Sequence, residues 1–273
     1  TLTNAGDGAV VVTLASSDTS TIADGQTVGT VSSSVTADSD VHIEATTTTS
    51  TSIASATGGN FESLVVNTAA ADTLVSDSTD TTTVSLSATS SISEDDTAIT
   101  YTATLTNAAD GAVVVTLANS DTITIADGQT VGTLSSSTGV TADSDVYNEA
   151  TTTLSTSIAS ATGGNFENLV VNTATANTTV SDSTDNTTVS LSATSSISED
   201  DTAIVYTATL TNAADGAVVV TLANSDTITI ADGATSGTVS SSVTADSDAH
   251  SEANTTTSTS IASATGGNFE NLV

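Results

Sequence analysis

Acidic residues recur at a fixed spacing in three segments of this chain. The spacing is Asp-x-Asp-x-x-x-Glu, and the three copies are Asp38, Asp40 and Glu44; Asp143, Asp145 and Glu149; and Asp246, Asp248 and Glu252. Ca²⁺ takes about six to eight oxygen ligands from carboxylates, carbonyls and water, whereas Mg²⁺ tends to keep its own waters. The alternating oxygen donors therefore indicate calcium binding, although the segments lack the glycine and the length of an EF-hand loop.

Other carboxylates gather in a short acidic loop and in an Asp-Ser-Thr-Asp segment, and both recur along the chain. These further candidate ligands are Asp77, Asp80, Glu94, Asp95, Asp96, Asp182, Asp185, Glu199, Asp200 and Asp201. Two like charges about 4 Å apart repel by about 1 kcal/mol in bulk water and by more near a protein surface. The alternative interpretation is that these residues are solubilising loop acids that bind nothing in particular.

Composition favours the first of these interpretations. The chain has 273 residues, 32 of them Asp or Glu, with no Lys or Arg and a formal net charge of -32. Without cationic side chains it cannot neutralise phosphates, which excludes nucleic-acid binding and a polybasic contact with anionic lipid. No apolar stretch is long enough for a membrane-spanning helix, so direct membrane insertion is not expected. We therefore expect an external cation, Ca²⁺, to supply the missing positive charge.

The chain is a tandem repeat. Thr1-Leu2-Thr3-Asn4 recurs at 104–107 and at 209–212, with offsets of 103 and 105 residues. A period of this length is typical of a self-contained domain rather than of a solenoid unit. We expect a partial repeat lacking its first strand at 1–80, a complete repeat at 81–185, and a partial repeat lacking its last strand at 186–273. Because it contains no Met, the chain is expected to be an internal piece or a processed product.

The complete repeat has the composition and alternation of β-strands. Thr, Val, Ile and Ser alternate in apolar and polar positions between Gly, Asp and Asn breaks, a pattern that favours strands over helices. We expect seven strands, at 82–91, 97–106, 112–118, 122–126, 129–137, 151–161 and 168–180. Their predicted core residues are Ile99, Tyr101, Ala103, Leu105, Val113, Val115, Leu117, Ile123, Ile125, Leu154 and Ile158. The Asp127-Gly128 pair predicts a hairpin turn.

Seven short strands in about 105 residues predict an all-β fold of tandem immunoglobulin-like β-sandwiches. An odd number of antiparallel passes places chain entry and exit at opposite ends, so we expect the repeats to lie end to end as a rod. Loops then alternate between the two ends, and of all 32 carboxylates only Asp72 falls inside a predicted strand. Twelve carboxylates are expected to meet where the complete repeat joins the next one: Glu94, Asp95, Asp96, Asp121, Asp143, Asp145, Glu149, Asp182, Asp185, Asp215, Asp232 and Glu270.

Several strings resemble a known family. They include Thr-Val-Ser-Leu-Ser-Ala-Thr (83–89), Ile-Ser-Glu-Asp-Asp (92–96), Ile-Thr-Ile-Ala-Asp-Gly (123–128), Gly-Gly-Asn-Phe-Glu-Asn-Leu (163–169) and Asp-Ser-Thr-Asp (182–185). They are similar to the tandem extender repeats of giant RTX-type bacterial adhesins. This resemblance implies calcium-stiffened immunoglobulin-like domains that project an adhesive tip from the bacterial cell surface after type I secretion. It also implies that Glu94, Asp143, Asp145, Asp182, Asp185 and their repeat equivalents are ligands.

Three functional hypotheses follow, and none of them is an enzyme. His42 and His250 stand where the complete repeat has Tyr147, so a hydrolytic triad would lack its base in that repeat. The leading hypothesis is a structural spacer in an extracellular adhesin, with neighbouring repeats of the same chain as its partners. The second is a subunit of an extracellular filament or biofilm-matrix fibre in which identical chains exchange strands. The third is a module that binds glycans through calcium.

Overall fold

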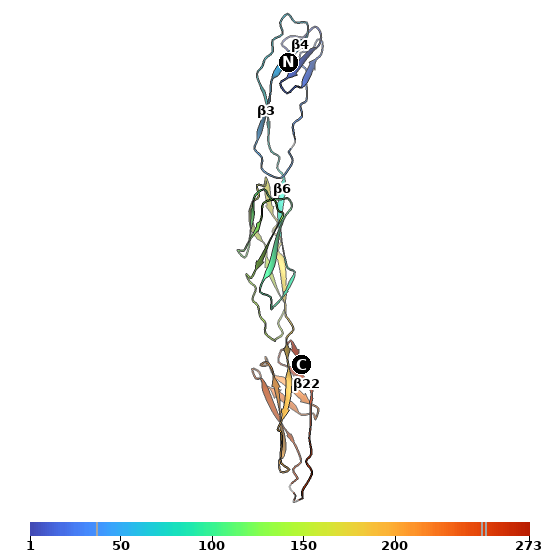
Figure 1. Ribbon diagram of the computed structural model, residues 1–273, viewed down its shortest axis with the longest axis vertical. Helices are drawn as coiled ribbons and strands as arrows, with labels where there is room; N and C mark the ends of the chain where they lie inside the picture. The colour runs from blue at the N-terminus through green and yellow to red at the C-terminus, as the bar shows by residue number, and fades with distance from the viewer. Residues whose placement is uncertain (37, 247, 249) are drawn as a thin grey trace.

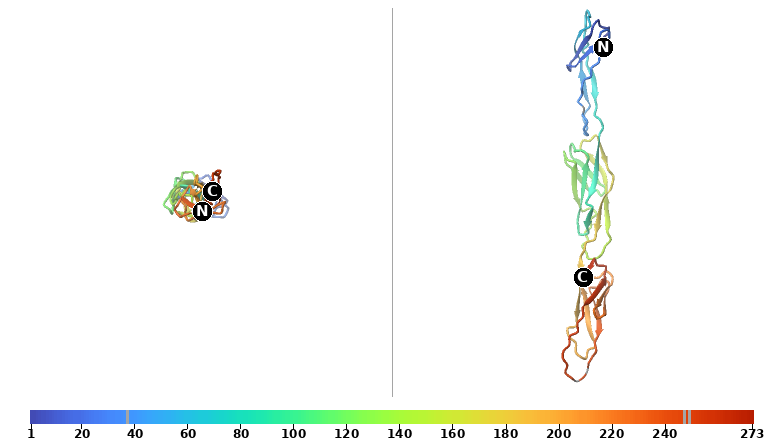
Figure 2. Two further views of the ribbon diagram at one scale, coloured as in Figure 1. Left: turned by 90° about the horizontal axis from the view of Figure 1, so that it is seen from below. Right: turned by 90° about the vertical axis from the view of Figure 1, so that its right-hand side faces the viewer.

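The computed structural model describes residues 1–273 except 37, 247 and 249. We refer to residues 1–80, 81–185 and 186–273 as repeats 1, 2 and 3. They follow one another along one long axis (Figure 1), and the view along that axis shows a narrow cross-section (Figure 2). No described residue is helical, so the described part of the chain contains no helix that could cross a membrane.

Repeat 2 contains three small sheets. The first has the order β11 (Val131–Ser136), β8 (Ile99–Leu105), β6 (Thr81–Ala88) and β14 (Asn168–Val171). The second has the order β10 (Thr122–Ile125), β9 (Val113–Leu117) and β13 (Ile158–Gly163), and the third β12 (Thr152–Thr156), β15 (Ala176–Ser181) and β7 (Ser91–Ser93). Pairing is antiparallel except for β14 with β6 and β15 with β7, which are parallel. The all-β sandwich class predicted from the sequence is confirmed.

Three of the seven predicted strands are each divided into two. The segment 82–91 forms β6 and β7, 151–161 forms β12 and β13, and 168–180 forms β14 and β15. In each case the two halves pair with different sheets, because the chain crosses from one sheet to the other partway along the repeat. Alternation alone could not show this, since it does not identify the sheet with which a segment pairs.

The predicted core of repeat 2 is largely confirmed. Ile99, Tyr101, Ala103 and Leu105 of β8 are buried and pack with Val113, Val115, Leu117, Ile123, Ile125 and Ile158. Leu154 is half-buried and packs against this cluster.

The predicted hairpin at Asp127-Gly128 is wrong. The turn is present, with the Gln129 N–H bonded to the Ala126 carbonyl at 3.0 Å, but β10 and β11 belong to different sheets.

Repeats 1 and 3 keep parts of this pattern. Repeat 1 has β1 (Val10–Leu14), β2 (Thr19–Ile22), β3 (Thr47–Thr51), β4 (Ile53–Gly58) and β5 (Ala71–Val75). Repeat 3 has β16 (Asn186–Thr187), β17 (Val189–Ala193), β18 (Ala203–Leu210), β19 (Val218–Leu222), β20 (Thr227–Ile230), β21 (Ser236–Ser242), β22 (Ile261–Gly266) and β23 (Asn271–Leu272). Among the residues assigned to these strands, Asp72 in β5 is the single carboxylate, as predicted.

The glycine pair after β13 fixes a close approach at the end of repeat 2 where the chain enters. Gly164 has a φ of 79°, and a Cβ placed there would lie 2.6 Å from Cγ2 of Val113 and would also collide with the ring of Phe166. Gly164→Ala should therefore destabilise the chain by about 3 kcal/mol, combining backbone strain with overpacking. Urea unfolding followed by circular dichroism measures this loss.

Gly128→Ala is the matched control for this substitution. Gly128 also has a positive φ, 71°, but a Cβ there would meet nothing within 4 Å. Its substitution should cost only the backbone strain, on the order of 1 kcal/mol. Equal destabilisation by the two substitutions would show that the approach of Phe166 to Gly164 does not constrain the fold.

Candidate metal sites at the joints

Each repeat docks onto the next through a short antiparallel contact. At the first joint, between repeats 1 and 2, His42 forms an isolated β-bridge with Phe166. The Ile43 N–H donates to the Asn165 carbonyl at 2.9 Å, and the Glu167 N–H donates to the Val41 carbonyl at 3.1 Å. These bonds position Glu44 and Glu167, which lie on opposite sides of the joint, next to each other.

The second joint, between repeats 2 and 3, repeats this geometry. Tyr147 forms a β-bridge with Phe269. The Asn148 N–H donates to the Asn268 carbonyl at 2.9 Å, and the Glu270 N–H donates to the Val146 carbonyl at 3.1 Å. This backbone contact thus places a carboxylate of the following repeat beside the acidic loop of the preceding repeat.

Four carboxylates form the second-joint cluster: Glu94, Glu149, Asp182 and Glu270, with one oxygen of each within 4.8 Å of the others. Glu94 is 6 % exposed and accepts a hydrogen bond from the Ser183 hydroxyl at 3.1 Å. Asp182 accepts from the Glu149 N–H at 3.1 Å, and Glu270 accepts from the Asp185 N–H. Among the described residues, Asp182 Oδ1 and Glu270 Oε1 are buried oxygens with no hydrogen-bond partner.

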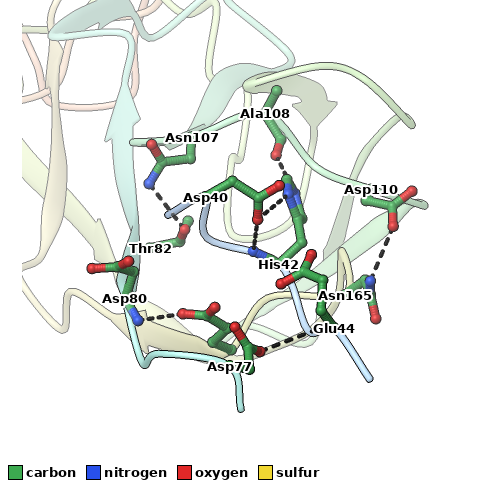
Figure 3. Close-up of polar contacts among 11 residues, drawn as sticks. Asp40, His42, Glu44, Asp77, Asp80, Thr82, Asn107, Ala108, Asp110 and Asn165 are labelled. Atoms are coloured by element: carbon green, nitrogen blue, oxygen red, sulfur yellow. Dashed lines mark hydrogen bonds and ion pairs between the residues drawn. The ribbon is translucent and has the colours of Figure 1, made fainter. Parts of the chain in front are cut away.

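The first-joint cluster consists of Glu44, Asp77 and Glu167, which meet the same distance criterion. Asp77 Oδ2 accepts from the Glu44 N–H at 3.1 Å, and Glu167 accepts from the Asp80 N–H (Figure 3). Glu44, Asp77 and Glu167 correspond to Glu149, Asp182 and Glu270 of the second joint, and the position equivalent to Glu94 would precede Thr1.

Glu44 and Glu149 hold protons more tightly than isolated glutamates do. Desolvation, together with the charges of Asp145, Asp182, Glu94 and Asp143, raises the pKa of Glu149 to about 7. Desolvation and the charges of Asp40, Asp77 and Asp38 likewise raise the pKa of Glu44. A divalent cation among these oxygens would remove the repulsion that causes both shifts.

The two glutamates contributed by the following repeat behave in the same way. The Asp80 N–H lowers the pKa of Glu167, but desolvation and the charge of Asp77 outweigh it and the pKa lies above its ordinary value. Desolvation and the charge of Asp182 raise the pKa of Glu270, against the effect of the Asp185 N–H. All four shifted glutamates thus lie at the joints.

The predicted Asp-x-Asp-x-x-x-Glu spacing forms compact groups in two of its three copies. Asp38, Asp40 and Glu44 lie within the same 4.8 Å limit, as do Asp246, Asp248 and Glu252 at the far end of repeat 3. The second aspartate of each copy also accepts a backbone hydrogen bond two residues on, from the N–H of His42, Tyr147 or His250. This aspartate therefore shapes the loop, whether or not it binds a metal.

Nine predicted ligands belong to no such group within the described part of the chain. They are Asp80, Asp95, Asp96, Asp143, Asp145, Asp185, Glu199, Asp200 and Asp201. Asp96 accepts a hydrogen bond from the Ser93 N–H at 2.9 Å, and Asp201 does the same with Ser198 at 2.7 Å. Glu199, the equivalent of Glu94, is exposed in repeat 3.

Three of the twelve carboxylates expected at the second joint are engaged within their own repeats. Asp121 accepts from the Ser136 hydroxyl and the Asn119 amide. Asp215 accepts from the Asn268 amide at 3.0 Å, and Asp232 accepts from the Gly216 N–H at 2.9 Å. They are explained as loop-forming residues.

Glu167 and Glu270 are cluster members that the spacing pattern does not single out. Strand parity places Glu270 at the joint, but no neighbouring acid marks it as a ligand. The sequence did contain a signal for these residues: a glutamate follows the Phe of the Gly-Gly-Asn-Phe-Glu turn in every repeat, at Glu62, Glu167 and Glu270. A carboxylate that recurs in an otherwise uncharged turn could have been paired with the acidic loop of the preceding repeat.

One family model matches the chain three times, once in each repeat. The family model of the LapA domain matches residues 1–78, 80–183 and 185–273. Among solved structures, CBD12 from CALX1.2 is similar at 9% identity and a TM-score of 0.31, over 58% of this chain and 73% of that chain. A two-domain protein of unknown function from Bacteroides fragilis NCTC 9343 is similar at 9% identity and a TM-score of 0.27, over 59% and 89%. No curated protein matches the chain.

Proposed function

Because the chain belongs to the LapA domain family, whose repeats occur in large adhesins, we propose that it is a non-enzymatic spacer of a secreted, cell-surface adhesin and that Ca²⁺ stiffens its joints. On this proposal the repeats hold an adhesive region away from the bacterial surface. Their partners are the neighbouring repeats of the same chain.

The observation that carries the proposal is the pair of orphaned oxygens at the second joint. Asp182 Oδ1 and Glu270 Oε1 are buried without a partner, beside the buried carboxylate of Glu94. Burying an uncompensated carboxylate is costly, and the chain has no Lys or Arg to compensate it. A cation bound among these oxygens would satisfy them.

Calcium fits this donor set better than other common cations. The cluster offers only oxygen atoms, which suit hard cations, and carboxylates from both repeats provide several ligands without requiring ideal octahedral geometry. Glu94, Glu149 and Asp182 would hold the ion from repeat 2, and Glu270 would hold it from repeat 3. Because its ligands come from both sides, the bound ion would resist bending of the joint.

Small-angle X-ray scattering and thermal melting with and without calcium test the proposal. We expect about 1 mM Ca²⁺, near the extracellular level at which even weak sites fill, to give a longer and less flexible particle than a chelator does. We also expect calcium to raise the melting temperature. When the free ion concentration is about 100 times Kd, the free energy of unfolding should increase by about 2.7 kcal/mol. Identical dimensions and melting temperatures in both conditions would refute calcium stiffening.

The second candidate is a filament subunit that accepts strands from neighbouring chains. The Thr- and Val-rich edge strands contain neither the Lys nor the Pro that block edge pairing, and unprotected edges accept added strands. Electron microscopy separates the candidates, because ordered fibres support the filament and uniform separate rods support the spacer.

A further inference from the structure

The two joints share a contact that involves no carboxylate. The ring of His42 stacks on Phe166, with centroids 5.4 Å apart and planes at 21°, and the ring of Tyr147 stacks on Phe269 at 5.7 Å and 22°. Each ring also donates a hydrogen bond to the following repeat, from His42 Nε2 to the Ala108 carbonyl at 3.0 Å and from the Tyr147 hydroxyl to the Ala213 carbonyl at 2.7 Å. Figure 3 shows His42 directed at Ala108.

Imidazole and phenol are different groups, but here they make the same two contacts. Each is a flat ring that can stack on a phenyl group, and each has a polar hydrogen at its far side that can reach a carbonyl. A role in metal binding would not explain the exchange of His for Tyr, because the tyrosine hydroxyl is bonded to a backbone carbonyl. The exchange is explained if the position requires a ring with a donor at its tip.

The surface that receives the ring is built in advance. It consists of the Gly-Gly-Asn-Phe turn and the Asn-Ala-Ala-Asp loop, which are tied together in repeat 2 by Asn165 donating to Asp110 at 3.0 Å. The same tie occurs in repeat 1, where Asn60 donates to Asp7 at 3.2 Å although no described residue docks there. This surface, which we call the entry face, therefore keeps its hydrogen bonds without a bound neighbour.

The loop that delivers the ring keeps one hydrogen bond in the copy on which no described residue docks. In the third copy His250 is 85% exposed, and its N–H still donates to Asp248 at 2.7 Å, as Tyr147 does to Asp145 at 2.7 Å in the docked loop. Because these hydrogen bonds need not form on contact, less conformational entropy is lost. The linker also holds the two surfaces at high effective concentration.

We propose that the ring at positions 42, 147 and 250 is a docking latch whose partner is the entry face of a following repeat. The latch orients neighbouring repeats without a metal ion, and it accepts His or Tyr interchangeably. It is independent of the calcium proposed above, so the joints remain aligned, although less stiff, when calcium is removed.

Double electron–electron resonance in the presence of a chelator tests the latch. The chain has no Cys, so spin labels at Thr133→Cys and Thr238→Cys, on the equivalent exposed strand positions of β11 and β21, report only the second joint. The parent labelled chain should give one narrow distance distribution. Tyr147→Ala should broaden it, whereas Tyr147→His should keep it narrow because the first joint already uses His.

His250→Ala is the matched control, since it removes the same type of ring from a loop with no docked neighbour and should leave the distribution unchanged. Circular dichroism of Tyr147→Ala checks that the sheets persist. Tyr147→Phe keeps the ring stack but removes the hydrogen bond, so its distance distribution should have an intermediate width. A distribution for Tyr147→Ala as narrow as that of the parent, in chelator, would overturn the latch. This result would leave the calcium proposal untouched, because that proposal is judged by the difference between calcium and chelator.

Discussion

Glu94→Gln is expected to weaken calcium binding at the second joint by about tenfold, a loss of about 1.4 kcal/mol of binding free energy. Glu94 is the buried member of the second-joint cluster, and glutamine keeps its size while removing its charge. The first-joint cluster does not include Glu94, so its affinity should stay unchanged. Isothermal titration calorimetry should then resolve the weakened site from the unaffected one.

Glu199→Gln provides the control for this measurement. Glu199 is the equivalent residue of repeat 3, but it is exposed and belongs to no metal-sized group among the described residues. It has the same sequence context, Ile-Ser-Glu-Asp-Asp, as Glu94. If both substitutions reduced calcium binding equally, overall charge rather than the geometry of the second joint would determine the affinity.

The calcium-free chain is expected to become more stable, by several degrees in melting temperature, when the pH is lowered from 8 to 5. The pKa of Glu149 is raised from an ordinary value of 4.5 to about 7, so the folded chain takes up its proton more readily than the unfolded chain does. The stabilisation is fully present below about pH 4.5 and is lost as the pH rises through 7. Melting curves in chelator across this range measure it.

Calcium should reverse the direction of this dependence. On the proposed function the ion would bind the deprotonated carboxylates, so protons would compete with it and the calcium-loaded chain should lose stability as the pH falls. Glu149→Gln should remove most of the stabilisation seen in chelator between pH 5 and 8. Glu62→Gln, at an exposed position outside the clusters, should leave it in place. A calcium-free chain whose melting temperature falls steadily from pH 8 to pH 5 would contradict the assignment of Glu149.

Much of the fold follows from the sequence because the apolar residues that alternate with polar ones are also the residues that are buried. Ile99, Tyr101, Ala103 and Leu105 alternate with threonines, and these four residues are the ones that β8 buries. The crossing of a strand between sheets was not predictable, because a single residue separates β12 from β13. It depends on pairing partners that are distant in the sequence.

The candidate sites show the same division between local and long-range information. The acidic loop predicts Glu44 and Glu149 from spacing alone. Glu167 and Glu270 join them only because a β-bridge aligns two repeats, and a bridge between separate repeats has no local signature. The stacking of Tyr147 on Phe269 was hidden for the same reason, since the two rings are more than 100 residues apart.

The loop and the entry face of each joint have a further consequence for the length of the rod. Each repeat contains its own receiving surface at one end and its own delivering loop at the other. Repeat 2 has two residues, Thr138 and Gly139, that repeats 1 and 3 lack, and they lie outside both of the bridging segments. Removing or duplicating one whole repeat would therefore join ends that already fit. The reach of such a protein can change in steps of one repeat, by recombination between near-identical gene segments, without any new contact having to evolve.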